Sequence, residues 1–373
     1  MHVISDSNVG GAGILLESLL RHTKHDRGGI TVVLPHGGAM GKRYARLGVR
    51  VLPMLALPDK SFRLSDLRGL IRLLGADPPD ILHTHASLSA RVAGVLACHG
   101  RTAIVATRHC AYPVLREGAL WRRVRNRVGE RLLTDCTVAT AHAARENLIA
   151  LGVPPERVRL IRNGAEALCR PSSEELAALR RELSIPHDAF VCGMSARLVP
   201  VKGHETLLRA AKILLSRHTG YHFLFVGGGE ERERLAFLAR ELGVDGQLTM
   251  VGEVRDVAPY TALFDVAVNC SVGTETSSLA LSEAMSLGVP CIASRFGGNV
   301  EMVREGENGL LFPARDARAL CAAIERLAWD RVLYEELSRG ARGRFMRELR
   351  AEGMAAKYDA LYAELAGRRA NPM

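Results

Sequence analysis

The chain has 373 residues, of which 47% are hydrophobic, and carries a formal net charge of +10 from 50 Lys and Arg against 40 Asp and Glu. This length is too great for one ordinary core and predicts two domains. No apolar run reaches the roughly eighteen residues of a membrane-spanning helix, and the early glycines at 10, 11 and 13 exclude a signal peptide. We therefore expect a cytoplasmic protein.

The eight cysteines are scattered and form no C-x-x-C pair, which favours reduced core thiols over disulfides or zinc binding. The positive charge favours anionic partners, whether phosphates, acidic lipid headgroups or nucleic acid. Aromatic residues make up only 5% of the chain, and no nucleic-acid module is recognisable. We expect no nucleic-acid partner.

The first half alternates short apolar strands with amphipathic helices, a pattern typical of a parallel α/β sheet. A first strand from His2 to Ser5 runs into Gly10 and Gly11, a turn that lets a ligand approach the backbone closely. Leu16 stands where a dinucleotide fingerprint would have its third glycine, and no acidic residue follows the second strand. A nicotinamide enzyme is therefore a poor fit.

Three histidines follow strands of this half. His109 comes just after the strand from Ala103 to Thr107, where a side chain can reach a cleft, and His83 and His85 lie at the end of the strand before it. Simple hydrogen bonding is the alternative role for all three. A metal at His83 and His85 lacks a clear third ligand.

The segment from Leu120 to Leu133 predicts a basic amphipathic helix, because apolar residues recur every four positions among five arginines and one glutamate. Its apolar stripe can pack on the sheet, or the helix can contact an anionic membrane as a peripheral anchor on its inner face. The pattern loosens between 166 and 172, where we place the domain boundary.

The second half restarts the alternation with a strand from Ala189 to Ser195. Arg197 and Lys202 then bracket the loop before the next helix, where two cations could clamp a diphosphate or simply be solvated. A turn of three glycines, 227 to 229, follows the next strand.

The stretch from Val266 to Pro290 predicts a strand, a loop and a helix. In an open parallel sheet this junction lies at the carboxyl edge, and the free N–H groups of the helix form an anion site. Thr276, Ser277 and Ser278 can cap the helix. Glu275 in the loop and Glu283 about one turn into the helix would line one pocket, although such a pair also occurs by chance.

Together these segments resemble the retaining GT-B glycosyltransferases of family 4, glycosyl transferases group 1, over essentially the whole chain. The matching pieces follow one another in the family's order: Gly10-Gly11, Asn163-Gly164, Arg197-x4-Lys202-Gly203, Gly227-Gly228-Gly229-Glu230, Val251-Gly252, Glu275-x7-Glu283-Ala284, Gly288-Val289-Pro290 and Gly306-x2-Gly309.

The resemblance implies an α/β fold of two Rossmann-like domains whose parallel sheets face each other across a cleft. Residues 1–168 would bind the acceptor, and residues 169–346 would bind the nucleotide sugar. Residues 347–373 would form helices that cross back to the first domain.

The resemblance also implies the roles of the site residues. Arg197 and Lys202 would neutralise the diphosphate, Glu275 would hold hydroxyls of the donor sugar, and Glu283 would bind the ribose. His109 would reach the sugar and complete the catalytic set. The nucleotide-sugar site would comprise Gly10, Gly11, Arg197, Lys202, Gly228, Val254, Glu275, Thr276, Ser277, Ser278, Leu279 and Glu283.

The activity implied is transfer of a sugar, with retention, from a nucleotide diphosphate sugar to a hydroxyl of a cell-envelope, polysaccharide or lipid-linked acceptor. No D-x-D occurs in the chain, so we expect neither a metal nor another cofactor. Many relatives have Gly-Phe-Gly where this chain has Thr276-Ser277-Ser278, so a UDP-linked hexose or N-acetylhexosamine is only a first assignment of the donor.

Two other classes remain open at this stage. A phosphorylase or epimerase could use the same fold, and would act without an acceptor hydroxyl. A basic protein at the membrane surface that has lost catalysis would keep the same core pattern.

Overall fold

The computed structural model describes residues 1–8, 10–55, 64–85, 87–98, 100–109, 128–273 and 275–370. The chain divides into two compact units, one formed by residues 1–164 with 351–373 and the other by residues 165–350. The sequence places these boundaries after 168 and 346. Most of the predicted basic helix from Leu120 to Leu133 lies outside the described residues, which include only its helical end, 128–133.

Unit 1 contains a seven-stranded sheet in the order β3-β2-β1-β4-β5-β6-β7, and every neighbouring pair is parallel. Its strands are β1 (His2–Ile4), β2 (Thr31–Pro35), β3 (Arg50–Leu55), β4 (Ile81–His85), β5 (Ala103–Arg108), β6 (Cys136–Ala139) and β7 (Val158–Leu160). Its helices are α1 (Gly11–His22), α2 (Met40–Ala45), α3 (Leu64–Ala76), α4 (Leu88–Cys98), α6 (His142–Ala150) and α15 (Ala351–Ala370).

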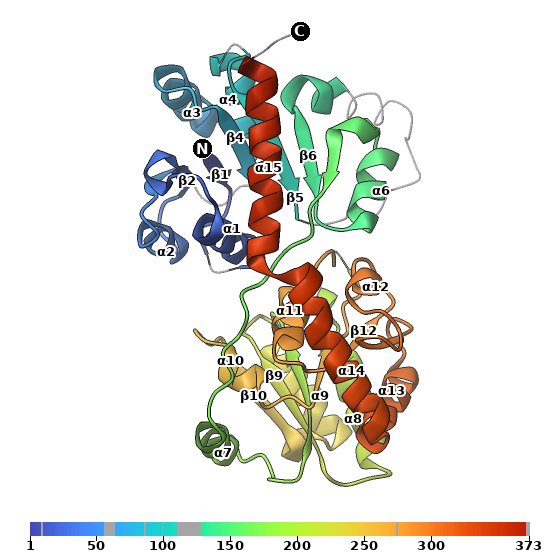
Figure 1. The fold of residues 1–373 in the computed structure, drawn as a ribbon. Helices are drawn as coiled ribbons and strands as arrows, with labels where there is room; N and C mark the ends of the chain where they lie inside the picture. The colour runs from blue at the N-terminus through green and yellow to red at the C-terminus, as the bar shows by residue number, and fades with distance from the viewer. Residues whose placement is uncertain are drawn as a thin grey trace. The chain divides into compact units, whose positions relative to one another are not determined.

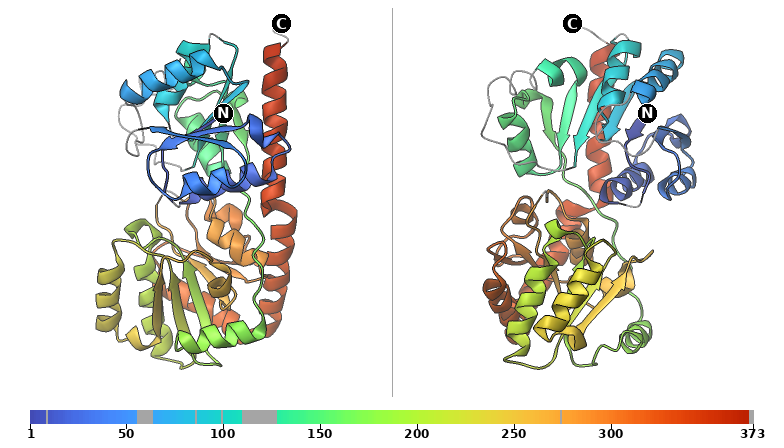
Figure 2. Two further views of the ribbon diagram at one scale, coloured as in Figure 1. Left: turned by 90° about the vertical axis from the view of Figure 1, so that its left-hand side faces the viewer. Right: turned by 180° about the vertical axis from the view of Figure 1, so that it is seen from behind.

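The two faces of this sheet differ in chemistry because side chains alternate along each strand. Val3, Leu82 and Ile104 point to the face covered by α3 and α4, where they form an apolar core. The other face carries His2 and His83, which contact Tyr362 of α15. Figures 1 and 2 show α15 lying lengthwise against this face, next to α1.

Unit 2 contains a six-stranded parallel sheet in the order β10-β9-β8-β11-β12-β13. Its strands are β8 (Phe190–Ser195), β9 (Tyr221–Val226), β10 (Leu248–Gly252), β11 (Val266–Asn269), β12 (Cys291–Ser294) and β13 (Gly309–Phe312). Its helices are α7 (Ser173–Glu182), α8 (His204–Leu215), α9 (Arg232–Leu242), α10 (Ala258–Thr261), α11 (Leu279–Ser286), α12 (Asn299–Met302), α13 (Ala317–Trp329) and α14 (Arg331–Arg344).

Both faces of the unit 2 sheet are apolar and buried, as expected for a parallel sheet covered by helices on both sides. On β9, Phe223 and Phe225 pack in the core formed with α8, α9 and α13. Leu224 and Val226 point the other way, into the core formed with α11 and with Phe345 after α14. Continuous apolar strands of this kind are what the sequence pattern predicts.

In each sheet the first strand lies in the middle and the chain then builds outward in both directions. The order reverses between β1 and β4 in unit 1 and between β8 and β11 in unit 2. Ligands of open α/β sheets bind at such a switch point, outside the carboxyl ends of the strands. The predicted class, α/β with two parallel Rossmann-like sheets, is confirmed.

Two further predictions from the sequence are that the cysteines are reduced and that no helix spans a membrane. The seven cysteines of the described chain are free, and only Cys169 is exposed. Among the described residues, no helix is both long and apolar enough to span a bilayer.

Candidate active site

The switch point of unit 2 brings Lys202 and Glu275 together. Lys202 ends the short helical turn Pro200–Lys202 after β8, and Glu275 lies in the loop between β11 and α11. The loops that carry them are joined by a hydrogen bond from the Val272 N–H to the Val201 carbonyl, 2.9 Å long. The ammonium of Lys202 lies 2.7 Å from Oε2 of Glu275.

Gly203 is needed for this close approach. Its φ of +71° is in the left-handed region, and a Cβ placed on it would lie 2.3 Å from the carbonyl oxygen of Cys270. A side chain at 203 would therefore push the Lys202 turn away from the loop that carries Glu275.

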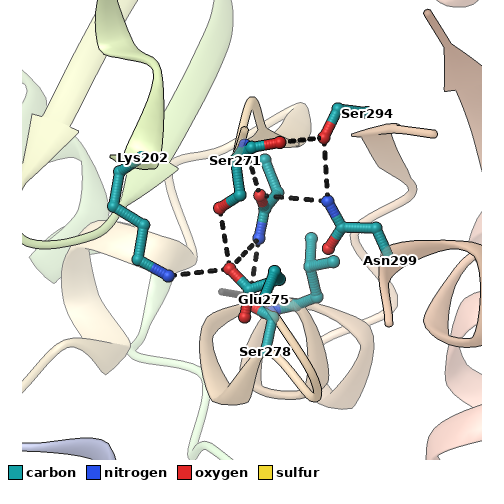
Figure 3. Close-up of polar contacts among 8 residues, drawn as sticks. Lys202, Ser271, Glu275, Ser278, Ser294 and Asn299 are labelled. Atoms are coloured by element: carbon teal, nitrogen blue, oxygen red, sulfur yellow. Dashed lines mark hydrogen bonds and ion pairs between the residues drawn. The ribbon is translucent and has the colours of Figure 1, made fainter. Parts of the chain in front are cut away.

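Glu275 is buried, and its Oε2 accepts three hydrogen bonds (Figure 3). The donors are Lys202 at 2.7 Å, the Ser271 hydroxyl at 2.7 Å and the Asn269 amide at 3.5 Å. Burial alone would raise the pKa of Glu275, but the Lys202 charge and these donors outweigh it and lower the pKa. The carboxylate is thus held ionised, with one oxygen occupied and Oε1 without a partner in the described chain.

The helix after Glu275 begins as the sequence predicts. Ser278 caps α11, because its side-chain oxygen accepts the N–H of Leu281. Its carbonyl accepts the N–H of Ser282, so the amides of Leu279 and Ala280 have no backbone acceptor in the described chain. These two N–H groups and the helix dipole favour an anion at this end.

The three residues between Glu275 and α11 turn their side chains inward. Thr276, Ser277 and Ser278 are all buried. The Ser277 hydroxyl donates to Sδ of Met302, and Ser278 accepts the Asn269 amide at 3.2 Å. A ligand beside this segment would therefore meet main-chain groups rather than a row of hydroxyls.

Glu283 lies in the second turn of α11 and is half-buried. Burial raises its pKa to about 7. Its carboxyl therefore changes charge close to neutral pH, and hydrogen-bond donors of a ligand would favour the ionised form.

Three other predicted residues follow the carboxyl ends of β8, β9 and β10. Arg197 is exposed, and no carboxylate of the described chain lies within ion-pair distance of its guanidinium. The carbonyl of Gly228 accepts the N–H of Leu198 at 2.8 Å, which joins the triple-glycine turn to the loop of Arg197. Val254 is half-buried after β10.

In unit 1, Gly10 and Gly11 follow β1 at the switch point of that sheet. Gly10 precedes the first turn of α1, and a Cβ placed on either glycine would meet no described atom within 4 Å. The space around this turn is therefore open to a ligand.

His109, also in unit 1, ends a chain of three imidazoles. Its Nε2 lies 3.1 Å from Nδ1 of His85, and Nε2 of His85 lies 3.4 Å from Nδ1 of His2. Burial lowers the pKa of His109 to about 4 and lowers the pKa values of His85 and His2 well below the ordinary range. All three rings are therefore neutral at physiological pH.

No third ligand beside His83 and His85 is evident from the sequence, but the pairing of β1 with β4 brings His2 next to them. Ring nitrogens of the three lie within 4.8 Å of one another. However, His83 already uses both nitrogens, with the Tyr362 hydroxyl at 2.6 Å and the Thr107 hydroxyl at 2.7 Å. Metal binding would have to break one of these bonds, so a hydrogen-bonded layer beneath α15 describes the group better.

Asn269 and Ser271, the two neutral donors to Glu275, are not among the site residues predicted from the sequence. Asn269 ends β11 and Ser271 follows it, so both lie at the sheet edge where ligand-binding residues gather. Their position directly after a buried strand was the available signal.

These features are typical of a class of α/β proteins that bind their ligands at the carboxyl edge of a parallel sheet. A cation, free helix N–H groups and a buried carboxylate at one switch point suit a ligand with phosphate and hydroxyl groups.

Comparison with known proteins names the family. Residues 177–344 match the family model for glycosyl transferases group 1, and residues 9–167 match that for Glycosyltransferase Family 4. The chain is 33% identical over 313 residues to a D-inositol 3-phosphate glycosyltransferase of Acidothermus cellulolyticus, a match that covers 76% of this chain and 68% of that one. The chain belongs to the group 1 glycosyltransferases and is a glycosyltransferase with the GT-B fold.

Two further relatives extend the comparison. The lipopolysaccharide core biosynthesis glycosyltransferase LpsE of Rhizobium meliloti is 33% identical over 219 residues, covering 58% of this chain and 61% of that one. The crystal structure of Anabaena Alr3699/HepE in complex with UDP matches with a TM-score of 0.83 at 20% identity, covering 97% of this chain and 99% of that one. A second structure of the same Anabaena protein is a complex with UDP-glucose.

Proposed function

We propose that this glycosyltransferase moves a sugar from a UDP-sugar to a hydroxyl of a cell-envelope glycan, a polysaccharide or a lipid-linked acceptor, with retention and without a metal. The observation that carries the proposal is the Lys202–Glu275 pair at the unit 2 switch point, of which Glu275 lies in the loop that precedes α11, whose first two amides have no backbone acceptor in the described chain. The UDP and UDP-glucose complexes of the Anabaena protein support the donor. The names of the inositol phosphate and lipopolysaccharide core relatives support the acceptor class.

The donor would place its diphosphate against Lys202, Arg197 and the first amides of α11. An ammonium has three N–H donors, so Lys202 can hold Glu275 and a phosphate oxygen at once. As the bond from the anomeric carbon to the phosphate breaks, negative charge grows on the leaving diphosphate, and cations fixed in advance stabilise it. Arg197 has an exposed guanidinium with which to do so.

Glu275 would accept hydroxyls of the donor sugar through Oε1, because Oε2 is occupied by three donors of the protein. Glu283 would accept the ribose hydroxyls, and neutral His109 would contact the sugar. The acceptor oxygen attacks the anomeric carbon on the face from which the diphosphate leaves. Its proton passes to the departing phosphate oxygen, and the products are the glycoside and UDP.

The first test is thermal stabilisation by UDP, GDP, ADP, dTDP and CMP and by their sugars, each with and without EDTA. A ligand at 100 times its Kd stabilises the native state by about 2.7 kcal/mol. We expect UDP and a UDP-sugar to stabilise the protein equally with and without EDTA. Stabilisation by no nucleotide, or only without EDTA, would contradict the proposal.

The second test is the anomeric configuration of the product, read by NMR from the coupling of the anomeric proton. An α-linked UDP-sugar should give an α-glycoside. A β-glycoside would exclude retention, and cleavage that depends on inorganic phosphate would indicate a phosphorylase instead.

A further inference from the structure

Beneath Glu275 lies a network of buried polar side chains, two of which donate to its carboxylate directly and two of which reach it only through the others. It consists of Asn269, Ser271, Ser294 and Asn299, and the dashed lines of Figure 3 mark the hydrogen bonds that join them. All four are buried, so none is available to solvent. Asn299 lies at the far end, at the first residue of α12.

Asn299 is the branch point of this network. Its amide nitrogen donates to Oδ1 of Asn269 at 3.3 Å and to the Ser294 hydroxyl at 3.0 Å. Both amide hydrogens are thereby used, while Oδ1 of Asn299 has no partner in the described chain. Reversing the amide would bring two acceptor oxygens together at Asn269, so the donor pattern fixes the orientation of Asn299.

The first branch orients Asn269. Oδ1 of Asn269 accepts from Asn299 and also from the Ser271 N–H at 3.0 Å. Two donors on this oxygen force the NH2 group of Asn269 to point the other way, toward Oε2 of Glu275 and the Ser278 hydroxyl oxygen. Without them, the amide could turn its oxygen toward the carboxylate, which is repulsive.

The second branch orients Ser271. The Ser294 hydroxyl accepts from Asn299 and donates to the Ser271 carbonyl at 2.6 Å. This bond fixes the main chain of Ser271, whose own hydroxyl donates to Oε2 of Glu275 at 2.7 Å. Both neutral donors to Glu275 are therefore linked to the amide of Asn299, Asn269 directly and Ser271 through Ser294.

The two residues before Asn299 hold the main chain of Glu275. The N–H of Gly298 donates to the Glu275 carbonyl at 3.1 Å. A Cβ on Gly298 would lie 1.5 Å from the Thr276 carbonyl oxygen, and one on Gly297 would lie 2.3 Å from that of Glu275. The turn from 297 to 299 thus lies directly against the loop of Glu275.

We propose that Asn299 is a positioning residue for the donor sugar, which orients Oε1 of Glu275 through Asn269 and Ser271 and contacts no substrate itself. This inference rests on the proposed role of Glu275. Its consequence is a specific one: loss of Asn299 should weaken recognition of the sugar and leave recognition of the nucleotide intact. A displacement of about 1 Å at a reacting group can reduce the rate about 100-fold.

The test compares Asn299→Ala with Asn308→Ala. Asn308 is a matched control because it is equally buried in unit 2 and has its own donors and acceptors, to the Met302 carbonyl at 3.0 Å and from the Arg304 N–H at 2.7 Å. Its amide also lies 3.4 Å from Sδ of Met285, and none of these hydrogen bonds of the described chain involves Glu275. Both variants should lower the melting temperature, so stability alone does not distinguish them.

Two measurements do distinguish them. In the unliganded protein, hydrogen exchange of the segment from 269 to 278 should quicken in Asn299→Ala beyond its rate in Asn308→Ala. With ligands, the extra stabilisation by UDP-glucose over UDP should fall in Asn299→Ala and persist in Asn308→Ala, and kcat/KM should fall about 10- to 100-fold in Asn299→Ala only. If Asn299→Ala does not fold, Asn299→Ser, which can donate to one acceptor only, should show an intermediate loss.

Glu275→Gln separates this inference from the proposed function. If Glu275→Gln loses the extra stabilisation by UDP-glucose but Asn299→Ala keeps it, and exchange in the segment from 269 to 278 matches that of Asn308→Ala, the positioning role is overturned. If Glu275→Gln itself keeps the extra stabilisation, the proposed role of Glu275 fails, and the positioning role fails with it.

Discussion

Nζ of Lys202 lies 2.7 Å from Oε2 of Glu275, although 73 residues separate them in the chain. The pair forms because β8 and β11 are neighbours at the unit 2 switch point, so the loops after them converge. Glu275 is 7% exposed and Lys202 26%, so solvent screens this ion pair less than a surface one.

Replacing Lys202 by Ala should destabilise unit 2 and reduce transfer. A buried carboxylate that loses its charged partner costs about 1–3 kcal/mol, and loss of a cation from the diphosphate site should reduce kcat/KM at least about 100-fold. Chemical denaturation and a transfer assay measure the two effects. Lys212→Ala, an exposed lysine of α8, is the control and should change stability by less than about 0.5 kcal/mol.

The stability loss in Lys202→Ala should depend on pH. The pKa of Glu275 is lowered from its ordinary 4.5 in the folded state, so the pair stabilises fully above that value and less as the pH falls below it. In Lys202→Ala, burial without the compensating charge should raise the pKa of Glu275 above 4.5. The difference between wild type and Lys202→Ala should therefore be largest at pH 8 and shrink as the pH falls toward 4. An equal difference at pH 4 and pH 7 would show that the pair is not the cause.

Gly203 and Gly243 offer a test of the close approach at the site. Their φ angles are +71° and +69°, but only a Cβ at 203 meets backbone, 2.3 Å from the Cys270 carbonyl, while a Cβ at 243 lies in open space. Gly243→Ala should cost about 1 kcal/mol for its backbone conformation, and Gly203→Ala at least about 1 kcal/mol more. Gly203→Ala should also reduce transfer, because it displaces Lys202. Equal unfolding free energies would contradict this account.

Glu283 should couple nucleotide binding to a proton. Its pKa is raised to about 7, and ribose hydroxyls that donate to the carboxylate would lower it, so binding should release a proton. Affinity for UDP should rise between pH 6 and pH 8, at most about tenfold per pH unit. Calorimetry in buffers of different ionisation enthalpy measures the number of protons released on binding. Glu283→Gln, titrated at the same pH values, should lack the proton release that comes from this carboxyl.

The same raised pKa predicts the effect of Glu283 on stability. A carboxyl with a raised folded-state pKa stabilises fully below about pH 4.5, and this contribution is lost as the pH rises through about 7. The free energy of unfolding of Glu283→Gln should therefore exceed that of wild type by more at pH 8 than at pH 5. A gain at pH 5 that equals that at pH 8 would contradict the burial of this carboxyl.

The histidine layer of unit 1 should make the protein sensitive to acid. Burial lowers the pKa values of His2, His83 and His85 well below 6.5 and that of His109 to about 4. Their contribution is present above pH 6.5 and is lost as the pH falls toward 4, by up to about 1.4 kcal/mol per pH unit for each histidine. The slope of the unfolding free energy against pH, measured between pH 7.5 and 5, tests this prediction. His85→Gln should reduce it, whereas His187→Gln, an exposed residue, should leave it unchanged.

Much of the fold could be predicted from the sequence, because its signals are local. Apolar runs such as Val266 to Val268 predict buried strands, and a serine before an apolar helical pattern predicts the cap that Ser278 forms. Lys202 and Glu275 were also predicted site residues, since each follows a buried strand.

The rest depends on neighbours that only the sheet order brings together. Asn269, Ser294 and Asn299 follow no spacing rule, and they meet because β11 and β12 end side by side. His2 joins His85 in the same way, through the pairing of β1 with β4. The sequence also does not show which way a hydroxyl or amide side chain points. The Ser277 hydroxyl, for example, faces Sδ of Met302.

Calorimetric titration of UDP and UDP-glucose in EDTA shows whether Lys202 and Glu275 form the donor site. Wild type should bind both, with higher affinity for UDP-glucose. Glu275→Gln should bind UDP as wild type does and lose the preference for UDP-glucose, and Lys202→Ala should bind both at least about tenfold more weakly. Wild-type affinities in both variants would contradict the account.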